Sequence, residues 1–121
     1  TERRAIQFAI DSGVGDEREF AGAISIHSIK LADHAGELGY WMAPEFRGRN
    51  ICSTAAELIT EFALDSIGFN RIEALVDHGN IASQKVLQKS GFEREGLLRK
   101  KVTKESGATV DMYIFARVSE R

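Results

Sequence analysis

The feature that most constrains the fold is a long helical pattern between two short apolar segments. Apolar residues recur every three or four positions from Ile51 to Ile67, and Gly68 ends the pattern. The flanking segments, Leu38–Ala43 and Arg71–Asp77, have the length and composition of buried strands, the first apolar on both faces. Such a strand–helix–strand unit predicts a right-handed crossover between parallel strands. The helix residues expected to face the core are Cys52, Ala55, Leu58 or Ile59, Phe62, Ala63 and Ile67.

The rest of the chain predicts four more strands and a second helix. Strands are expected at Ala5–Ser12, Phe20–Ile29, Phe92–Thr103 and Ala108–Val118, and a helix at Asn80–Ser90. A phase change at His27–Ser28 predicts a bulge or a strand end there. Turns are expected at Ser12–Asp16, Asp33–Gly36 and Ser106–Gly107. The order β-β-β-α-β-α-β-β predicts an α/β fold with a mixed sheet and helices packed on it.

Composition narrows the class of protein. The 121 residues suit a single domain, residues 1–121. With 16 basic and 18 acidic side chains, we expect no nucleic-acid partner. The longest apolar runs are too short for a membrane span, and we expect neither an export leader nor a membrane partner. Cys52 is the single cysteine, so a reducing, cytoplasmic location is expected. The three histidines have no metal-site spacing, so no metal is expected.

The loop before the long helix has the features of an anion site. The strand should stop at Pro44 and the helix should start near Ile51, with Asn50 as N-cap. The first-turn N–H groups lack intrahelical partners and carry the positive end of the helix dipole. Gly48 allows a ligand to come close to the backbone. Further donors come from Arg47, Arg49, Ser53 and Thr54. A diphosphate would suit this loop; a capped helix with two solvated arginines is the alternative.

At this loop the sequence resembles the GNAT acetyltransferase superfamily, and within it the ribosomal-protein-alanine N-acetyltransferase type. The family's acetyl-CoA loop reads Arg/Gln-x-x-Gly-x-Gly/Ala, and Arg47–Cys52 occupies those positions. Asn50 stands where Gly is usual, and Cys52 stands where Gly or Ala is usual. Asn tolerates left-handed backbone angles better than most residues. The resemblance therefore implies a diphosphate site that is weakened but works.

The resemblance covers about residues 36 to 118. It rests on Glu37–Trp41, on Asn80–Ser83 followed by Gly91–Phe92, and on Glu95, Gly96, Arg99, Gly107, Asp111 and Phe115. It implies a GNAT-like sheet that begins at the family's second strand and so lacks the opening strand and helices. It also implies acetyl-CoA as co-substrate and direct transfer of the acetyl group to an amine acceptor. A homodimer is expected, because one sheet edge or face would otherwise be uncovered.

The resemblance also implies which residues hold the cofactor. The backbone of residues 41–43 would hold pantetheine, residues 47–54 would hold the diphosphate, and Asn80 would contact the pantetheine or cysteamine end. The implied cofactor-binding residues are Trp41, Met42, Ala43, Arg47, Gly48, Arg49, Asn50, Ile51, Cys52, Ser53, Thr54 and Asn80.

Two residues are candidate catalytic groups. Glu37 is a candidate general base for the attacking amine, because an alkylammonium must lose a proton before it attacks; a charged residue at a strand mouth is the alternative. Many relatives place an acidic tyrosine where this chain has Leu87. Ser83 is therefore the nearest donor to the sulfur, or else an ordinary first-turn hydroxyl. Tyr40 and Tyr113 are further hydroxyl candidates, although both suit strand packing better.

Several alternatives remain open at this stage. Cys52 near a helix N-terminus could be a reactive thiolate, but its place on the apolar pattern favours a core residue. The basic run Arg99–Lys101 with Lys104 favours a solvated face. A non-catalytic CoA-binding or interaction module is the alternative to an N-acetyltransferase. The acceptor, a protein N-terminus or a small-molecule amine, is not fixed by the sequence.

Overall fold

The computed structural model describes residues 5–11, 20–48 and 50–121. Its strands are β1 (Ile6–Asp11), β2 (Phe20–Lys30), β3 (Ala35–Met42), β4 (Arg71–Asp77), β5 (Glu93–Thr103) and β6 (Thr109–Val118). Its helices are α1 (Ile51–Phe62), which continues as a π-helical turn at Ala63–Ile67, and α2 (Ile81–Lys89). Short 3-10 turns lie at Leu31–Asp33 and Pro44–Phe46. The predicted order of strands and helices is confirmed.

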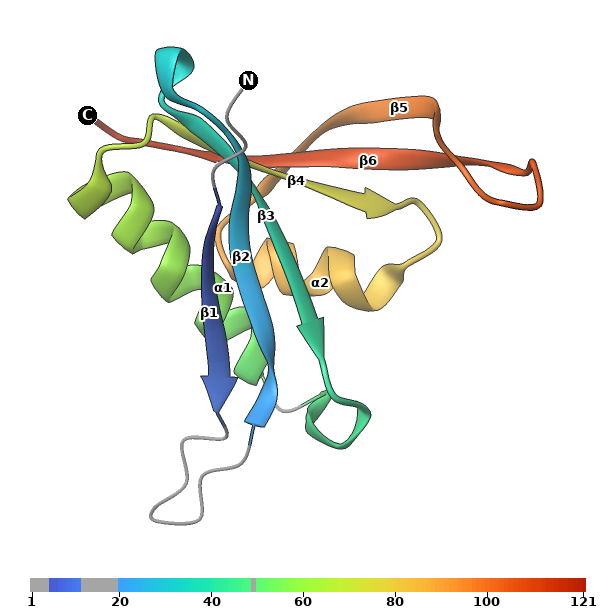
Figure 1. The fold of residues 1–121 in the computed structure, drawn as a ribbon, viewed down its shortest axis with the longest axis horizontal. Helices are drawn as coiled ribbons and strands as arrows, with labels where there is room; N and C mark the ends of the chain where they lie inside the picture. The colour runs from blue at the N-terminus through green and yellow to red at the C-terminus, as the bar shows by residue number, and fades with distance from the viewer. Residues whose placement is uncertain (1–4, 12–19, 49) are drawn as a thin grey trace.

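The strands form one mixed sheet in the order β1-β2-β3-β4-β6-β5, in which β3 and β4 are parallel and the other pairs are antiparallel. Both helices lie on one side of the sheet, behind it in the view of Figure 1. The Ser90 hydroxyl at the end of α2 donates to the Ser53 carbonyl in α1 at 3.1 Å. The opposite face has no helix over it in the part of the chain that the structure describes.

The two parallel strands separate after a short stretch of pairing. β3 and β4 are paired from Ala35 with Arg71 to Glu37 with Glu73. Beyond Glu37, β3 continues beside β2 while β4 continues beside β6, and the two strands diverge (Figure 1). α1 follows the end of β3 and α2 follows the end of β4, so both helix N-termini lie near this divergence.

The helix side of the sheet carries the core, and here one prediction is wrong. The buried face of the long helix consists of Ser53, Ala56, Thr60, Ala63 and Leu64. Of the predicted stripe, Ala63 is buried and Cys52, Ala55 and Ile59 pack at its margin. Leu58, Phe62 and Ile67 are 61%, 50% and 45% exposed. The small residues face the sheet because they allow the helix axis to approach it closely.

The strand before the loop is also less buried than expected. β3 begins at Ala35, earlier than the predicted Leu38, and Trp41 is 52% exposed on the face without helices. The Trp41 ring stacks on Phe20, with the ring centroids 6.1 Å apart. Phe20 lies on the same side of the sheet as Trp41 because the β1–β2 register shifts beside it, between Ile10 and Asp11.

Irregular backbone lies largely where the sequence predicted it. The register of β2 and β3 shifts between His27 and Lys30, and Ser28 has a φ of 51°. His34 is left-handed in the turn before β3, and Gly107, at φ 88°, lies in the turn before β6. The predicted turn at Ser12–Asp16 lies outside the described residues.

The apolar alternation of the last strand lies on the face without helices. Met112 and Ile114 are paired with Asp77 and Leu75, whereas Phe115 is paired with the core residue Ala74 and is fully buried. The side chains on the other face of β6, including Phe115, therefore meet the helices.

Candidate functional site

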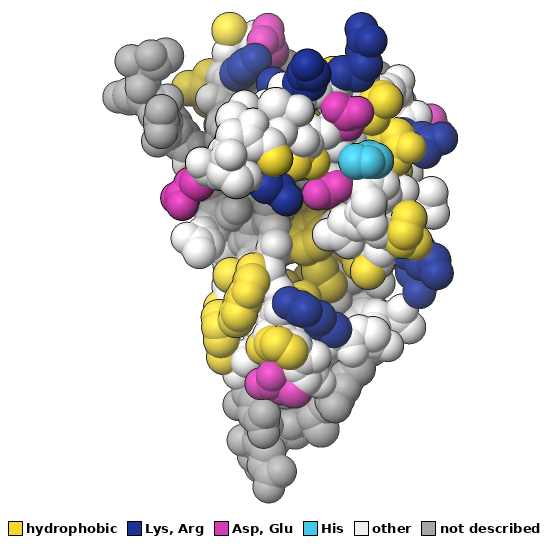
Figure 2. All heavy atoms as spheres, turned by 90° about the vertical axis from the view of Figure 1, so that its right-hand side faces the viewer, with side chains coloured by type: hydrophobic (Ala, Val, Ile, Leu, Met, Phe, Trp, Pro, Cys, Tyr) yellow, Lys and Arg dark blue, Asp and Glu magenta, His cyan; other side chains and the backbone are white. Residues whose placement is uncertain are grey.

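A cavity of about 530 Å³ lies where β3 and β4 diverge. It is enclosed by the end of β3, the loop before α1, the first turn of α1, and α2. Figure 2 shows a hollow in this side of the molecule with hydrophobic side chains inside it and basic side chains nearby. Ten of the sequence-predicted site residues line the cavity: Trp41, Met42, Arg47, Gly48, Asn50, Ile51, Cys52, Ser53, Asn80 and Ser83.

Asn50 begins α1 in a different way from the prediction. Its backbone is left-handed, at φ 59°, and its side chain makes no capping hydrogen bond to the helix. A residue in this conformation replaces the usual glycine without a change of backbone path, since Asn tolerates the left-handed region. The Asn50 carbonyl accepts the Thr54 N–H at 3.1 Å. Asn50 therefore occupies the N-cap position as predicted, but its side chain does not cap the helix, and its backbone adopts the left-handed conformation that Asn tolerates.

Two of the expected hydroxyl donors are already occupied. The Ser53 and Thr54 hydroxyls both donate to the Asn50 carbonyl, at 3.1 and 2.8 Å. The donors that this loop could still offer to an anion are backbone N–H groups of the first turn and cationic side chains. Thr54 and Ala43 are not among the cavity residues. The Ala43 N–H donates to the Ala21 carbonyl at 2.7 Å, so it is not available to a bound pantetheine. Arg49 lies outside the described residues.

The cationic side of the cavity includes two lysines that the sequence analysis missed. Arg47 lines the cavity, and its Nε donates to the Met42 carbonyl at 3.4 Å. Lys85 and Lys89 reach the same cavity from α2. Lys89 Nζ donates to Asn50 Oδ1 at 2.9 Å and thereby links α2 to the start of α1. Their four-residue spacing, which puts them on one helix face, was the available signal.

The start of α2 follows the sequence prediction. The Asn80 side chain caps the helix, since Asn80 Oδ1 accepts the Ser83 N–H at 3.1 Å. Gln84 Nε2 donates to the His78 carbonyl at 3.0 Å and anchors the same turn. Asn80 and Ser83 are thus held in fixed positions at one end of the cavity.

Three polar side chains meet at the strand side of the cavity: Tyr40, Ser83 and Cys52. The Tyr40 hydroxyl forms a hydrogen bond with the Ser83 hydroxyl and also donates to the Ser83 carbonyl at 3.3 Å. Burial raises the pKa of Tyr40, the bond from Ser83 lowers it, and nearby Cys52 raises it further. Burial also raises the pKa of Cys52 to about 11. Cys52 is therefore a neutral thiol at pH 7, which argues against a thiol enzyme.

Glu37 lies apart from the cavity residues. It occupies the last paired position of β3 and β4, with Glu73 beside it on β4 and His27 beside it on β2. Arg71 Nε donates to the Glu73 carboxylate at 2.8 Å. The alternation of β3 puts Glu37 on the face without helices and Tyr40 on the face with them. The two candidate catalytic residues, Glu37 and Ser83, therefore approach the divergence of the strands from opposite sides.

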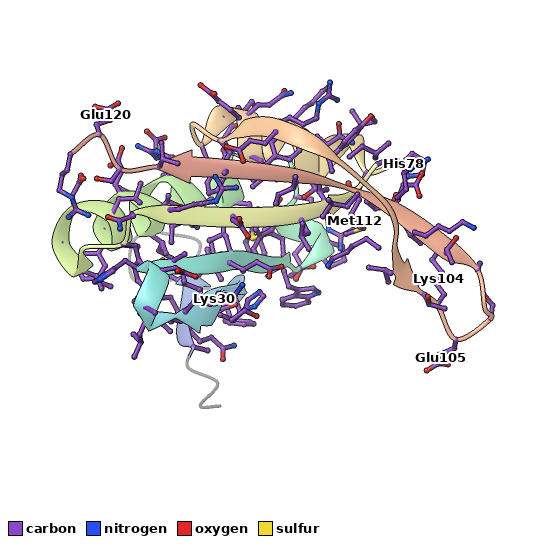
Figure 3. All side chains as sticks on the ribbon, turned by 90° about the horizontal axis from the view of Figure 1, so that it is seen from above. Lys30, His78, Lys104, Glu105, Met112 and Glu120 are labelled. Carbon is purple, nitrogen blue, oxygen red and sulfur yellow. The ribbon has the colours of Figure 1, made fainter. Side chains whose placement is uncertain are left out.

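Other sequence features have no visible place in this site. Arg99, Lys100, Lys101 and Lys104 are exposed on the β5–β6 hairpin, which confirms the solvated face. Figure 3 shows Lys104 and Glu105 at the tip of this hairpin, which projects from the body.

Among residues 5–11, 20–48 and 50–121, no His, Cys, Asp and Glu side chains are grouped to hold a metal ion. Within the same ranges no helix has the length and apolar character to cross a membrane.

Comparison with known proteins identifies the family. Residues 1–93 match the family model described as an acetyltransferase (GNAT) domain. The chain belongs to the GNAT acetyltransferase family. The mixed six-stranded sheet with two helices is consistent with the GNAT fold.

Individual GNAT proteins resemble the chain along most of its length. YoaA, an uncharacterized N-acetyltransferase of Bacillus subtilis, is 29% identical over 120 residues, which are 99% of this chain and 66% of YoaA. The ribosomal-protein-serine acetyltransferase of Escherichia coli is 28% identical over 84% of this chain and 56% of its own. The solved structure of Mycobacterium smegmatis RimJ in complex with CoA-disulfide has a TM-score of 0.84 and 29% identity, over 97% of this chain and 54% of that one. The chain thus spans between about half and two thirds of these GNAT relatives.

Proposed function

We propose that residues 1–121 form a single acetyl-CoA-binding domain of an N-acetyltransferase, which moves an acetyl group from acetyl-CoA to a primary amine. The observation that carries this proposal is the cavity at the divergence of β3 and β4, lined by residues from the loop, α1 and α2. Membership of the GNAT family supports the transfer chemistry. The RimJ structure, which contains a CoA derivative on a similar fold, supports the ligand.

The cavity would hold the diphosphate of acetyl-CoA at its α1 end and the thioester at its Ser83 end. The diphosphate would lie at the first turn of α1, where Arg47 and Lys89 also line the cavity. The pantetheine would follow the end of β3, beside Trp41 and Met42, toward Asn80. The thioester would then lie near Ser83, deeper in the divergence of the strands. No metal takes part in this arrangement.

In the proposed acetyl transfer, the amine and the acetyl-CoA would meet where β3 and β4 diverge, each coming from a different face of the sheet. An acceptor amine would approach from the face without helices, on which Glu37 lies, and Glu37 would take its proton directly or through water. The neutral amine attacks the acetyl carbonyl, and the CoA thiolate leaves toward Ser83. No covalent enzyme intermediate is needed. A protein N-terminus and a small-molecule amine are both suitable acceptors in this scheme.

We further propose a cytoplasmic homodimer without nucleic-acid or membrane partners. The single cysteine supports a reducing compartment. The exposed Leu58 and Phe62, one turn apart on the outer side of α1, support an interface there.

Binding and transfer need separate measurements. Calorimetry should detect acetyl-CoA binding, and a panel of N-terminal peptides and small amines should reveal transfer. With a working acceptor, Glu37→Gln should keep acetyl-CoA affinity and lower turnover about 10²–10⁴-fold. The loss should shrink as pH rises, because more of the amine is then neutral without help. Tight binding with no acetylated amine would instead indicate a non-catalytic CoA-binding module, and absence of binding would refute the proposal.

A further inference from the structure

Tyr40 of β3 and Ser83 of α2 form a hydroxyl pair across the wall of the cavity. The pair can donate in two directions. In one arrangement, the Tyr40 O–H donates to the Ser83 carbonyl at 3.3 Å, which leaves the Ser83 O–H to donate to the Tyr40 oxygen. In the reverse arrangement, the Tyr40 O–H donates to Ser83 Oγ and the Ser83 O–H is free to turn into the cavity.

The second arrangement bears on catalysis if the proposed function is correct, because Ser83 then faces the thioester of acetyl-CoA. We propose that Tyr40 is a positioning residue, which holds Ser83 Oγ as an acceptor and so directs the Ser83 O–H toward the cofactor sulfur. Many relatives have a tyrosine donor at the position that Leu87 occupies in this chain. Here Tyr40 of β3 and Ser83 of α2 would together supply that donor. Tyr40 acts through Ser83 and needs no contact with the substrate.

The step keeps its atoms and electrons in balance. The amine nitrogen forms a bond to the acetyl carbon, the C–S bond breaks, and its electron pair stays on the sulfur. The Ser83 O–H donates a hydrogen bond to the developing thiolate, while the Tyr40 O–H donates to Ser83 Oγ and strengthens the first bond. The proton lost by the amine goes to the base or to water, and CoA takes its thiol proton from water after release.

The environment of Tyr40 suits a donor that stays protonated at neutral pH. Burial and the nearby Cys52 thiol raise the pKa of Tyr40, while the Ser83 bond lowers it. An alkyl thiol has a pKa of about 8.5, so full proton transfer from Tyr40 to the thiolate would be uphill. Lys85 and Lys89 of α2 line the same cavity. Tyr40 therefore contributes a hydrogen bond and keeps its own proton.

The kinetic test uses the chain with acetyl-CoA and an acceptor that the parent protein acetylates. Ser83→Ala should lower kcat about 10²-fold, as loss of a donor at a developing charge does. Tyr40→Phe should lower kcat roughly tenfold with KM for acetyl-CoA unchanged. The Tyr40→Phe/Ser83→Ala double variant should be no slower than Ser83→Ala, because the two residues act as a unit. Ser83→Thr, which keeps the hydroxyl, should recover most of the rate.

Tyr113 provides the matched control. It lies under Arg94, whose guanidinium carbon is 4.5 Å from the ring centroid, so Tyr113→Phe should leave kcat unchanged. Additive losses in the double variant, or a Tyr40→Phe effect on KM alone, would overturn the proposal and show that Tyr40 only packs.

A second test requires neither catalysis nor ligand. The chain has two tyrosines, so Tyr113→Phe leaves Tyr40 as the one tyrosinate chromophore. Adding Ser83→Ala in that background should raise the pKa of Tyr40, because the bond that lowers it is removed. Ser83→Thr should leave it unchanged. An equal pKa with and without the Ser83 hydroxyl would refute the pair, even if acetyl transfer is confirmed. The expected shift without any acetyl transfer would support the pair and refute the proposed function on which its role rests.

Discussion

Replacing Lys89 by Met should weaken acetyl-CoA binding while it leaves the fold intact. Lys89 is exposed on α2, and its Nζ lies 2.9 Å from Asn50 Oδ1 at the start of α1. If the diphosphate occupies that helix N-terminus, its two charges lie roughly 5 Å from the ammonium. In a water-like dielectric each such pair contributes about 0.8 kcal/mol. Met keeps most of the side-chain length and removes the charge, so the two pairs together are worth about 1.7 kcal/mol and affinity should fall roughly fifteenfold.

Calorimetry at two ionic strengths gives a sharp readout of this effect. In about 0.1 M salt the screening length is roughly 10 Å and the loss should be full; in 1 M salt the length is about 3 Å and the loss should nearly vanish. Lys101→Met removes an equal charge from the exposed hairpin and should have no effect. Pantetheine, which lacks the diphosphate, should bind both proteins equally. An unchanged affinity in Lys89→Met, or an equal loss in Lys101→Met, would refute the reasoning.

Three further predictions concern stability, reactivity and assembly. Phe115→Ala removes a fully buried ring and should lower the free energy of unfolding in urea by about 3–5 kcal/mol, whereas the exposed Val118→Ala should change it by less than about 0.5 kcal/mol. Because burial raises the pKa of Cys52 to about 11, the thiol should react slowly with iodoacetamide at pH 8, and more slowly still with acetyl-CoA present; reaction at the rate of free cysteine would contradict the burial. Light scattering at micromolar concentration should give the mass of a dimer, and Phe62→Asp should favour the monomer; a monomer throughout would contradict the proposed interface.

The sequence predicted the order of the elements because apolar periodicity is a local property. It also predicted the loop before α1, since Pro44, Gly48 and Asn50 signal a turn and a helix start without reference to the rest of the chain. The buried face of α1 was predicted wrongly. The apolar pattern predicted that large residues such as Phe62 face the sheet. In the structure the smaller Ser53 and Thr60 face it instead, because small side chains allow the helix to pack close to the sheet.

The missed parts of the site depend on contacts between distant elements. The hydroxyl pair joins residues 43 positions apart, and Lys89 meets Asn50 across 39 positions. No local pattern shows that α2 lies beside the start of α1. The exposed side of β3 was missed for a related reason. The apolar residues of that strand indicate burial, but they do not show whether another element covers Trp41.

The most direct test of the central claim is a crystal structure of the chain with CoA. The account predicts the diphosphate at the first turn of α1, within reach of Arg47 and Lys89, and the thiol at the Tyr40–Ser83 end of the cavity. CoA bound outside the divergence of β3 and β4, or bound with its thiol at the α1 end, would contradict it.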